Sequence, residues 1–375
     1  MPLDPYFAHR LRRHRRYLLR QALQRLRAAV PWPLLSRASV SASLSPSATP
    51  APAAVSAAPA PTRAERSAVL RARHRRAALA WDRDELSTAG TPGPDVPTTE
   101  HVIAVPGFPD VTVRVYRPAV DDVIRPAALH FFGGAFRIGG IDYPTTDAAC
   151  RRRAAEADIV VVAVAYALAP EHRFPTPVEQ GHAALEWLIH ESAALRIDPG
   201  RIAITGTSAG GAIAAAVTLM NRDRHRHPLR LQVLEVPVTD LTGAHIDVRP
   251  TWRMGVPALI VLRELRSIAR TYLPDPARAR HPYASPLRAA DHTGLPPALI
   301  LTAEYDTLRR DGAAYGAALR RSGVDATVVR YLGVTHDTPI YTGALPAARA
   351  WHEQVIGALR TLHDDRAPGA DEVSR

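Results

Sequence analysis

The stretch IAITGTSAGG, residues 202–211, decides the expected fold of this 375-residue chain. An alternating apolar segment leads into the pattern Gly-x-Ser-x-Gly, and the small residues AIAAAV at 212–217 continue it as a helix. Gly206 and Gly210 suit a sharp strand-to-helix turn, because a side chain at either position would clash between the two backbones. A turn of this kind typically presents a serine nucleophile, here Ser208, to solvent at its tip. A chance match of so short a pattern is the alternative.

The composition excludes several kinds of chemistry. All 47 basic residues are arginine, so the chain can form neither a lysine Schiff base nor a Ser-Lys dyad. Cys150 is the single cysteine, which excludes an internal disulfide and a cysteine-based zinc site, and we predict no metal site. No run of about 18 apolar residues occurs, which argues against a membrane span. We therefore predict a cytoplasmic protein, and the sequence does not define its oligomeric state.

The net charge of +11 is concentrated near the N-terminus, where residues 1–40 hold nine arginines and a single acid. Within the segment 1–37, apolar residues recur at helical spacing over 5–30 and arginines lie mostly opposite them. This pattern predicts a basic amphipathic helix that can contact an anionic membrane surface, with a solvated helix or a partly disordered tail as the alternative. No nucleic-acid-binding motif accompanies the charge, so we predict no nucleic-acid partner. The Ala/Ser/Pro-rich residues 38–62 are expected to form a flexible linker, and residues 364–375 a disordered tail.

From residue 63 to residue 363, apolar strand patterns alternate with helical ones. Strands are expected at 101–105, 111–116, 127–132, 159–165, 201–205, 231–236, 298–302 and 327–331. Helices are expected near 64–86, 145–157, 176–195, 209–222, 257–272, 308–322 and 346–363. The first two strands are close enough for a hairpin, and helices separate the later ones, which predicts parallel pairing. We therefore expect an α/β hydrolase fold, with an eight-stranded, mostly parallel sheet and helices on both faces.

A serine hydroxyl becomes a good nucleophile only when a base takes its proton and a carboxylate orients that base. Asp306 and His336 each follow the C-terminal end of a predicted strand, the edge where open α/β sheets bind ligands. The order serine, acid, histidine is that of this fold. Asp306 alone could simply cap the next helix; Glu304 is a rival acid, and Asp337 adjoins the base. We rank Asp306 first because it lies at the tip of the loop.

The stretch FFGGAF, residues 131–136, follows the third predicted strand. Acyl transfer needs backbone N–H groups aimed at the oxygen that becomes negative, and small residues let the backbone approach the substrate. Gly134, Ala135 and Ala209, the residue after the predicted nucleophile, are the candidate donors, with Gly133 in support. A glycine turn without a catalytic role is the alternative.

These residues resemble the hormone-sensitive-lipase-like, or GDXG, family of α/β hydrolases, over roughly residues 80 to 362. Four further segments match motifs of that family in its order: YALAPEHRFP at 166–175, PVTD at 237–240, ASPL at 284–287 and DTLR at 306–309. The resemblance implies a carboxylesterase or lipase with no cofactor. It also implies a triad of Ser208, Asp306 and His336, and a helical lid with parts near 63–95 and 243–285.

The chain departs from the family at three positions. Phe132 stands where the family motif His-Gly-Gly-Gly has its histidine, and Ala135 stands at its third glycine. The lost histidine removes a hydrogen-bonding support, so we expect a weakened or redirected activity, although the N–H of Ala135 can still donate. Thr207 replaces the commoner aspartate, a variant known within the family.

The sequence therefore predicts a serine hydrolase that cleaves carboxylic esters of small to medium acyl chain through an acyl-enzyme. The alternative is a catalytically weakened member of the same fold that binds a small molecule. The choice between ester and amide substrates stays open.

Overall fold

The computed structural model describes residues 1–13 and 62–364. The predicted basic helix lies outside the described residues from residue 14 onward, and residues 5–13 are helical. The predicted linker and C-terminal tail also lie outside them, apart from one residue each. The chain divides into two units, Ala8–His74 and a larger unit made of Met1–Phe7 with Arg75–Arg375. Across the part that the structure describes, no helix combines the length and apolarity needed to cross a membrane.

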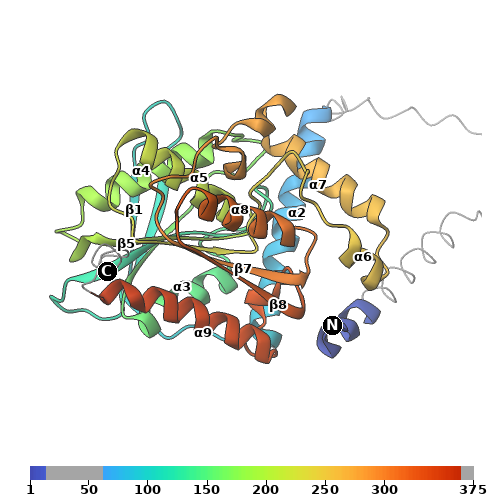
Figure 1. Ribbon diagram of the computed structural model, residues 1–375, viewed down its shortest axis with the longest axis horizontal. Helices are drawn as coiled ribbons and strands as arrows, with labels where there is room; N and C mark the ends of the chain where they lie inside the picture. Colours follow the sequence, from blue (N-terminus) through green and yellow to red (C-terminus); the bar gives the residue numbers. More distant parts are fainter. Residues whose placement is uncertain (14–61, 365–375) are drawn as a thin grey trace, which may run out of the picture. The chain divides into compact units, whose positions relative to one another are not determined.

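An eight-stranded sheet runs through the larger unit in the order β1-β2-β4-β3-β5-β6-β7-β8 (Figure 1). β2 pairs antiparallel with β1 and β4, and the other neighbouring strands pair in parallel. The strands are β1 (Thr98–Ile103), β2 (Val111–Tyr116), β3 (Arg125–Phe131), β4 (Val160–Val164), β5 (Ile197–Thr207), β6 (Leu231–Glu235), β7 (Ala298–Tyr305) and β8 (Ala326–Thr335). The predicted α/β hydrolase fold and its mostly parallel sheet are confirmed.

The central strands are apolar because both of their faces are covered. β4 reads VVVAV, and all five of its residues are buried, as expected for a parallel strand between two helical layers. β7 and β8 run past their predicted ends at 302 and 331, because a register shift near the end of the pair brings Tyr305 opposite Thr335. This extension carries the two strands to the loops of the candidate site.

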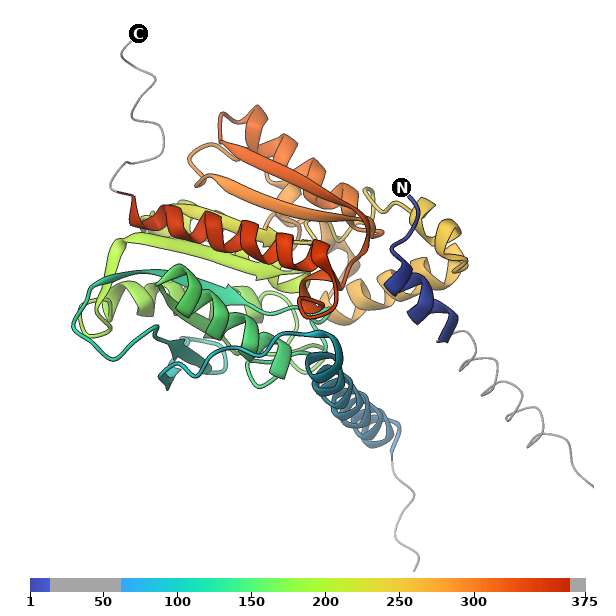
Figure 2. The same ribbon diagram turned by 90° about the horizontal axis from the view of Figure 1, so that it is seen from below.

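Helices cover both faces of the sheet. α3 and α9 lie on one face, and α4, α5 and α8 lie on the other (Figures 1 and 2). The helices of the larger unit and its border are α2 (Arg63–Ala89), α3 (Pro144–Ala157), α4 (Thr176–His190), α5 (Ala209–Arg224), α6 (Arg249–Met254), α7 (Ala258–Tyr272), α8 (Arg309–Arg321) and α9 (Pro346–Arg360). α6 was not predicted, because six residues are too few to show a helical period. The small residues of α5 are buried and let this helix lie close to the strands.

Hydrogen bonds hold two segments of the larger unit, the second half of α2 and residues 1–7, against the rest of that unit. The carboxylate of Asp82, in the second half of α2, accepts hydrogen bonds from the backbone N–H and the hydroxyl of Thr145 at 2.9 and 2.5 Å. These bonds satisfy groups that the first turn of α3 leaves free. Near the N-terminus, the backbone N–H of Asp4 donates to the carbonyl of Gly333 at 2.8 Å, and Phe7 is buried. Residues 1–7, which the sequence assigns to a separate basic segment, thus pack beside the end of β8.

The two ranges predicted as lid parts contain helices. α2 occupies most of residues 63–95, while α6, α7 and a short 3-10 helix, Pro276–Arg280, occupy residues 243–285. α6 contacts β7, and α7 contacts α6 and the 3-10 helix. Their role as a lid stays a prediction.

Candidate active site

Ser208 lies at the junction of β5 and α5, where the backbone turns sharply. Its φ of 55° and ψ of −114° are unusual for a residue with a side chain. A Cβ at Gly206 would lie 2.3 Å from the carbonyl oxygen of Gly210, and a Cβ at Gly210 would lie 2.1 Å from that of Phe131. Only glycine fits at both positions, so the predicted strand-turn-helix geometry is confirmed.

Three side chains from different strand ends form a chain of hydrogen bonds. Nε2 of His336, after β8, lies 2.9 Å from Oγ of Ser208 and can accept its proton. Nδ1 of His336 lies 2.8 Å from Oδ2 of Asp306, after β7. The other oxygen of Asp306 accepts the backbone N–H of Leu308 at 2.8 Å. Asp306 therefore caps the loop before α8 and also orients His336. Both interpretations offered by the sequence, a helix cap and the acid partner of the histidine, apply to this residue.

The rival carboxylate points elsewhere. Oε2 of Glu304 accepts the backbone N–H of Gly333 at 2.9 Å, and Oε1 lies 3.2 Å from the guanidinium of Arg253. The structure thus pairs His336 with Asp306, the acid that the sequence analysis ranked first, and assigns Glu304 to holding the β7 and β8 ends together.

Ser208 is covered more than the sequence suggested. It is only 9% exposed, so the expectation that it projects into open solvent is wrong. His336 lies against its hydroxyl, and the backbone of Gly133 packs beside it, since a Cβ at Gly133 would lie 3.5 Å from the Cβ of Ser208. The nucleophile is therefore enclosed by the histidine and by the loop after β3.

The charge of Asp306 controls the protonation of His336. Burial opposes protonation of the ring, but the nearby Asp306 carboxylate and its hydrogen bond outweigh this effect and raise the pKa of His336 to about 9. Solvent reaches 31% of the side chain and screens part of the attraction. The upward direction means that the neutral, proton-accepting form of His336 becomes more abundant as the pH rises above neutrality.

The loop after β3 has the strained backbone expected of a close approach to the nucleophile. Gly134, Ala135 and Phe136 have φ values of 138°, 54° and 60°. Within the residues described, the backbone N–H groups of Gly134 and Ala135 have no acceptor. The N–H of Ala209 opens α5 and has no partner within its helix. These three groups are therefore free to bind an anionic oxygen.

Stacked aromatic rings hold this loop on both sides. Phe132 is 3% exposed, and its ring stacks on Tyr166 with centroids 4.1 Å apart and planes 11° apart. The hydroxyl of Tyr166 donates to the carbonyl of Phe132 at 2.7 Å. On the other side, Phe136 stacks on Tyr272 of α7 at 3.8 Å. The position that lacks the family histidine is thus a packed aromatic site.

A buried ion pair beneath the turn was not predicted. The guanidinium of Arg153, on α3, contacts the carboxylate of Glu235, at the end of β6, and both side chains are almost fully buried. The same carboxylate accepts hydrogen bonds from Trp351 at 2.8 Å and from the Thr207 hydroxyl at 3.3 Å. The backbone carbonyl of Glu235 accepts the N–H of Ser208 at 2.8 Å. Glu235 therefore supports the turn through both its backbone and its side chain.

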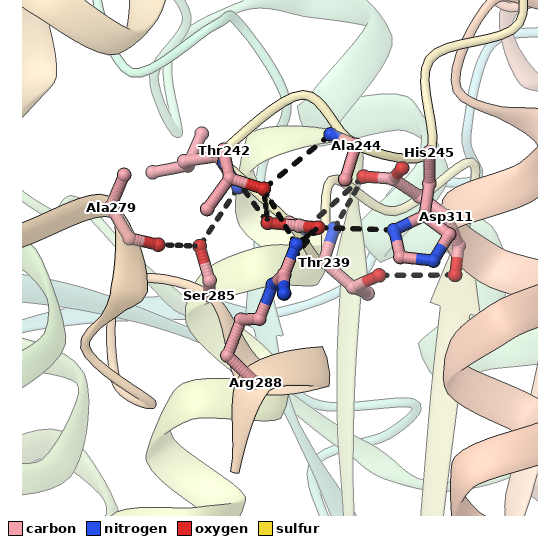
Figure 3. A network of polar contacts seen from close by, with 10 residues as sticks. Thr239, Thr242, Ala244, His245, Ala279, Ser285, Arg288 and Asp311 are labelled. Atoms are coloured by element: carbon pink, nitrogen blue, oxygen red, sulfur yellow. Dashed lines mark hydrogen bonds and ion pairs between the residues drawn. The ribbon is translucent and has the colours of Figure 1, made fainter.

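A second polar network joins the segment after β6 to α8 and to Arg288 (Figure 3). One carboxylate oxygen of Asp311, on α8, accepts the backbone N–H groups of Thr239 and Asp240 at 3.1 Å each. Asp240 in turn binds Arg288 at 2.8 Å and His245 at 3.0 Å. Burial, together with the neighbouring charge of Asp240, raises the pKa of Asp311 to about 7. The network joins the family-like segment PVTD to the helix that follows the acid loop.

Comparison with known proteins agrees with this geometry. Residues 128–340 match a family model described as an alpha/beta hydrolase fold. Carboxylesterase NlhH of Mycobacterium tuberculosis is 35% identical over 275 residues, 72% of this chain and 84% of the relative. An ethyl acetate hydrolase of Pseudomonas putida is 36% identical over 228 residues, 60% of this chain and 70% of the relative. The crystal structure of EstE1, a thermostable carboxylesterase from a metagenomic library, has a TM-score of 0.70 and 35% identity, covering 78% of this chain and 97% of that one.

Proposed function

Because the chain belongs to the hormone-sensitive-lipase-like carboxylesterase family of α/β hydrolases, we propose that it hydrolyses carboxylic esters through an acyl-enzyme formed on Ser208. The protein is a carboxylic ester hydrolase, and the proposal concerns which residues do the chemistry and on which esters. The observation that carries it is the hydrogen-bonded chain from Ser208 through His336 to Asp306.

In the first half-reaction, His336 accepts the proton of the Ser208 hydroxyl as its oxygen attacks the acyl carbon. Asp306 keeps Nδ1 of the histidine protonated and stabilises the imidazolium that forms. The imidazolium then gives its proton to the departing alkoxide, which leaves as the alcohol. In the second half-reaction, water attacks the ester of Ser208 and His336 takes a proton of that water. The bond to Oγ of Ser208 then breaks, the imidazolium returns its proton to Oγ, and the acid leaves.

The negative oxygen of each tetrahedral intermediate would bind to the N–H groups of Gly134, Ala135 and Ala209. This assignment is supported by the lack of another acceptor for the first two groups within the described chain and by the left-handed backbone that exposes them. One such donor contributes about 3 to 4 kcal/mol to transition-state stabilisation in serine proteases. Ala135 supplies the same backbone donor as a glycine would, since its φ of 54° is already adopted.

We assign small to medium acyl chains to the substrate. Ser208 is 9% exposed, and the stack of Phe136 on Tyr272 places an aromatic wall from α7 beside the oxyanion loop. In this proposal α6 and α7 form the lid over the acyl group. The Pseudomonas putida relative, which is an ethyl acetate hydrolase, is consistent with a short acyl chain.

The test compares wild type with Ser208→Ala, and with Ser87→Ala as the matched control at an exposed serine. Hydrolysis of p-nitrophenyl esters from acetate to palmitate is measured, and labelling by a fluorophosphonate is followed by intact-protein mass. We expect loss of at least about a thousandfold in kcat and complete loss of labelling for Ser208→Ala only. A residual rate above about one hundredth of wild type would contradict the assignment. A wild-type protein that binds esters without hydrolysing them would favour the small-molecule binder.

A further inference from the structure

Three metal-binding side chains meet on the surface formed by α4 and the end of α5. They are His182 and Glu186, one helical turn apart on α4, and His225, directly after α5. One ligand atom of each lies within 4.8 Å of those of the other two. Nε2 of His182 and Nδ1 of His225 are 3.4 Å apart, and Nδ1 of His225 lies 3.1 Å from Oε1 of Glu186.

These separations match the spacing of ligands around one small cation. Zinc binds imidazole nitrogen at about 2.0 to 2.1 Å in a tetrahedron, so two ligand atoms on the same ion lie about 3.4 Å apart. The pairs His182–His225 and His225–Glu186 are already near this spacing. The third pair, His182–Glu186, lies within 4.8 Å, so we expect an ion to need only rotation of the side chains.

The backbone of this surface is held in place independently of the three side chains. The carboxylate of Glu179 on α4 binds the guanidinium of Arg224 on α5 through two hydrogen bonds of 2.7 and 2.8 Å. The buried side chain of Asn221 pins the segment after α5, because it accepts the N–H of His227 at 3.0 Å and donates to its carbonyl at 2.9 Å. His225 is thus fixed opposite α4 by contacts that do not involve its ring.

The local charge and the access from solvent also suit a cation. The carboxylate of Glu186 contributes a negative charge, and the guanidinium of Arg224, in the last turn of α5, is bound to Glu179. About 45% of the His225 side chain and 42% of the Glu186 side chain are exposed, which gives an ion access from solvent.

Although the sequence alone predicts no metal site, we propose that His182, Glu186 and His225 bind one divalent transition-metal ion of the zinc class, with solvent at the remaining position. Imidazole ligands favour zinc, nickel and copper, whereas magnesium and calcium prefer oxygen ligands alone. The ion would link α4 to the end of α5 through its ligands and so stabilise the contact between the two helices. α5 has 16 residues, so this end is about 24 Å from Ser208, and the ion acts as a structural link without entering the hydrolytic reaction.

The test uses the full chain after removal of metal by a chelator. Zinc is titrated in competition with a chromophoric chelator, and the melting temperature is measured with and without zinc. We expect one zinc ion per chain in wild type, with affinity reduced at least tenfold in His225→Ala and in Glu186→Gln. His190→Ala is the matched control, because His190 lies on the same helix and is 84% exposed beside Glu191. His182 is left intact because it is buried and its loss could disturb folding.

The proposal further predicts that zinc raises the melting temperature of wild type and of His190→Ala, but not of His225→Ala. Magnesium at the same concentration should have no effect. Failure of wild type to bind zinc, or equal zinc affinity in wild type and both ligand variants, would overturn the proposal. An equal effect of magnesium would overturn the metal class. Ester hydrolysis should be the same before and after chelation, so the outcome for the metal is independent of the outcome for Ser208.

Discussion

Replacing Phe132 by histidine tests whether the loss of the family histidine weakens catalysis, or whether the loop is instead held by the packing of Phe132. From the sequence, restoring the family histidine would raise kcat/KM about tenfold if only a hydrogen bond had been lost, and would cost stability if Phe132 were a core residue. The structure favours the second outcome. The ring is 3% exposed and stacks on Tyr166 at 4.1 Å. The backbone of Gly139 also lies close to the ring, since an added Cβ there would lie 2.7 Å from it.

The size of the effect follows from these contacts. Weakening the stack on Tyr166 costs about 0.5 to 1.5 kcal/mol. Burying an imidazole N–H without a partner adds about 1 to 3 kcal/mol, since the Tyr166 hydroxyl is already bound to the carbonyl of residue 132. We therefore expect Phe132→His to lose about 1.5 to 4.5 kcal/mol of unfolding free energy. For a unit of this size, that loss lowers the melting temperature by about 5 °C.

The assay measures urea unfolding and kcat/KM for p-nitrophenyl acetate on the same preparations. Phe132→Leu is the control, because it keeps an apolar side chain and loses mainly the stack; it should cost less stability than Phe132→His and keep more activity. We expect kcat/KM of Phe132→His to fall, because the loop that presents the Gly134 and Ala135 N–H groups loosens. A tenfold rise in kcat/KM with unchanged stability would refute this reasoning and would restore the weakened-esterase interpretation.

Two further predictions concern protonation. Because only neutral His336 accepts the serine proton and its pKa is raised to about 9, kcat/KM should rise from neutral pH, pass half of its limiting value near pH 9 and level off above that pH. A pH-stat profile already flat from pH 6.5 would contradict this. Asp311 has its pKa raised from 3.8 to about 7, so it penalises the folded state increasingly as the pH rises from about 4 to about 7. Asp311→Asn should therefore leave the free energy of unfolding in urea unchanged near pH 4 and raise it at pH 8 by at most about 4 kcal/mol. Asp240→Asn should instead lower the free energy of unfolding, because it removes the partner of Arg288. Equal effects of Asp311→Asn at both pH values would contradict the raised pKa of Asp311.

The parts of the site that the sequence predicted depend on local patterns. Gly206 and Gly210 flank a serine between an apolar strand and a helix of small residues, and each pattern is complete within about ten positions. Asp306 and His336 could be placed because each follows a strand, and parallel strands end at the same edge of the sheet. Local patterns did not give the length of β7 and β8, because their extension depends on a pairing between the two strands.

What the sequence missed depends on residues that are distant in the chain. The low exposure of Ser208 comes from Gly133 and His336, which belong to other strand ends. The aromatic role of Phe132 depends on Tyr166, which lies on the neighbouring strand's loop. A motif comparison marks Phe132 as a lost histidine, and only the packing shows what replaced it.

The buried pair of Arg153 and Glu235 explains a further departure from the family, Thr207 in the nucleophile motif. The Thr207 hydroxyl lies 3.3 Å from the Glu235 carboxylate and donates to it. An aspartate at this position would bring a second negative charge beside Glu235. Among the residues described, Arg153 supplies the one guanidinium that contacts the Glu235 carboxylate, so it would face two negative charges. Position 207 is half-buried, and two like charges side by side at the edge of a buried site would repel each other. Thr207 instead supplies a neutral donor, so the identity of the residue beside the nucleophile follows from the charge buried beneath it.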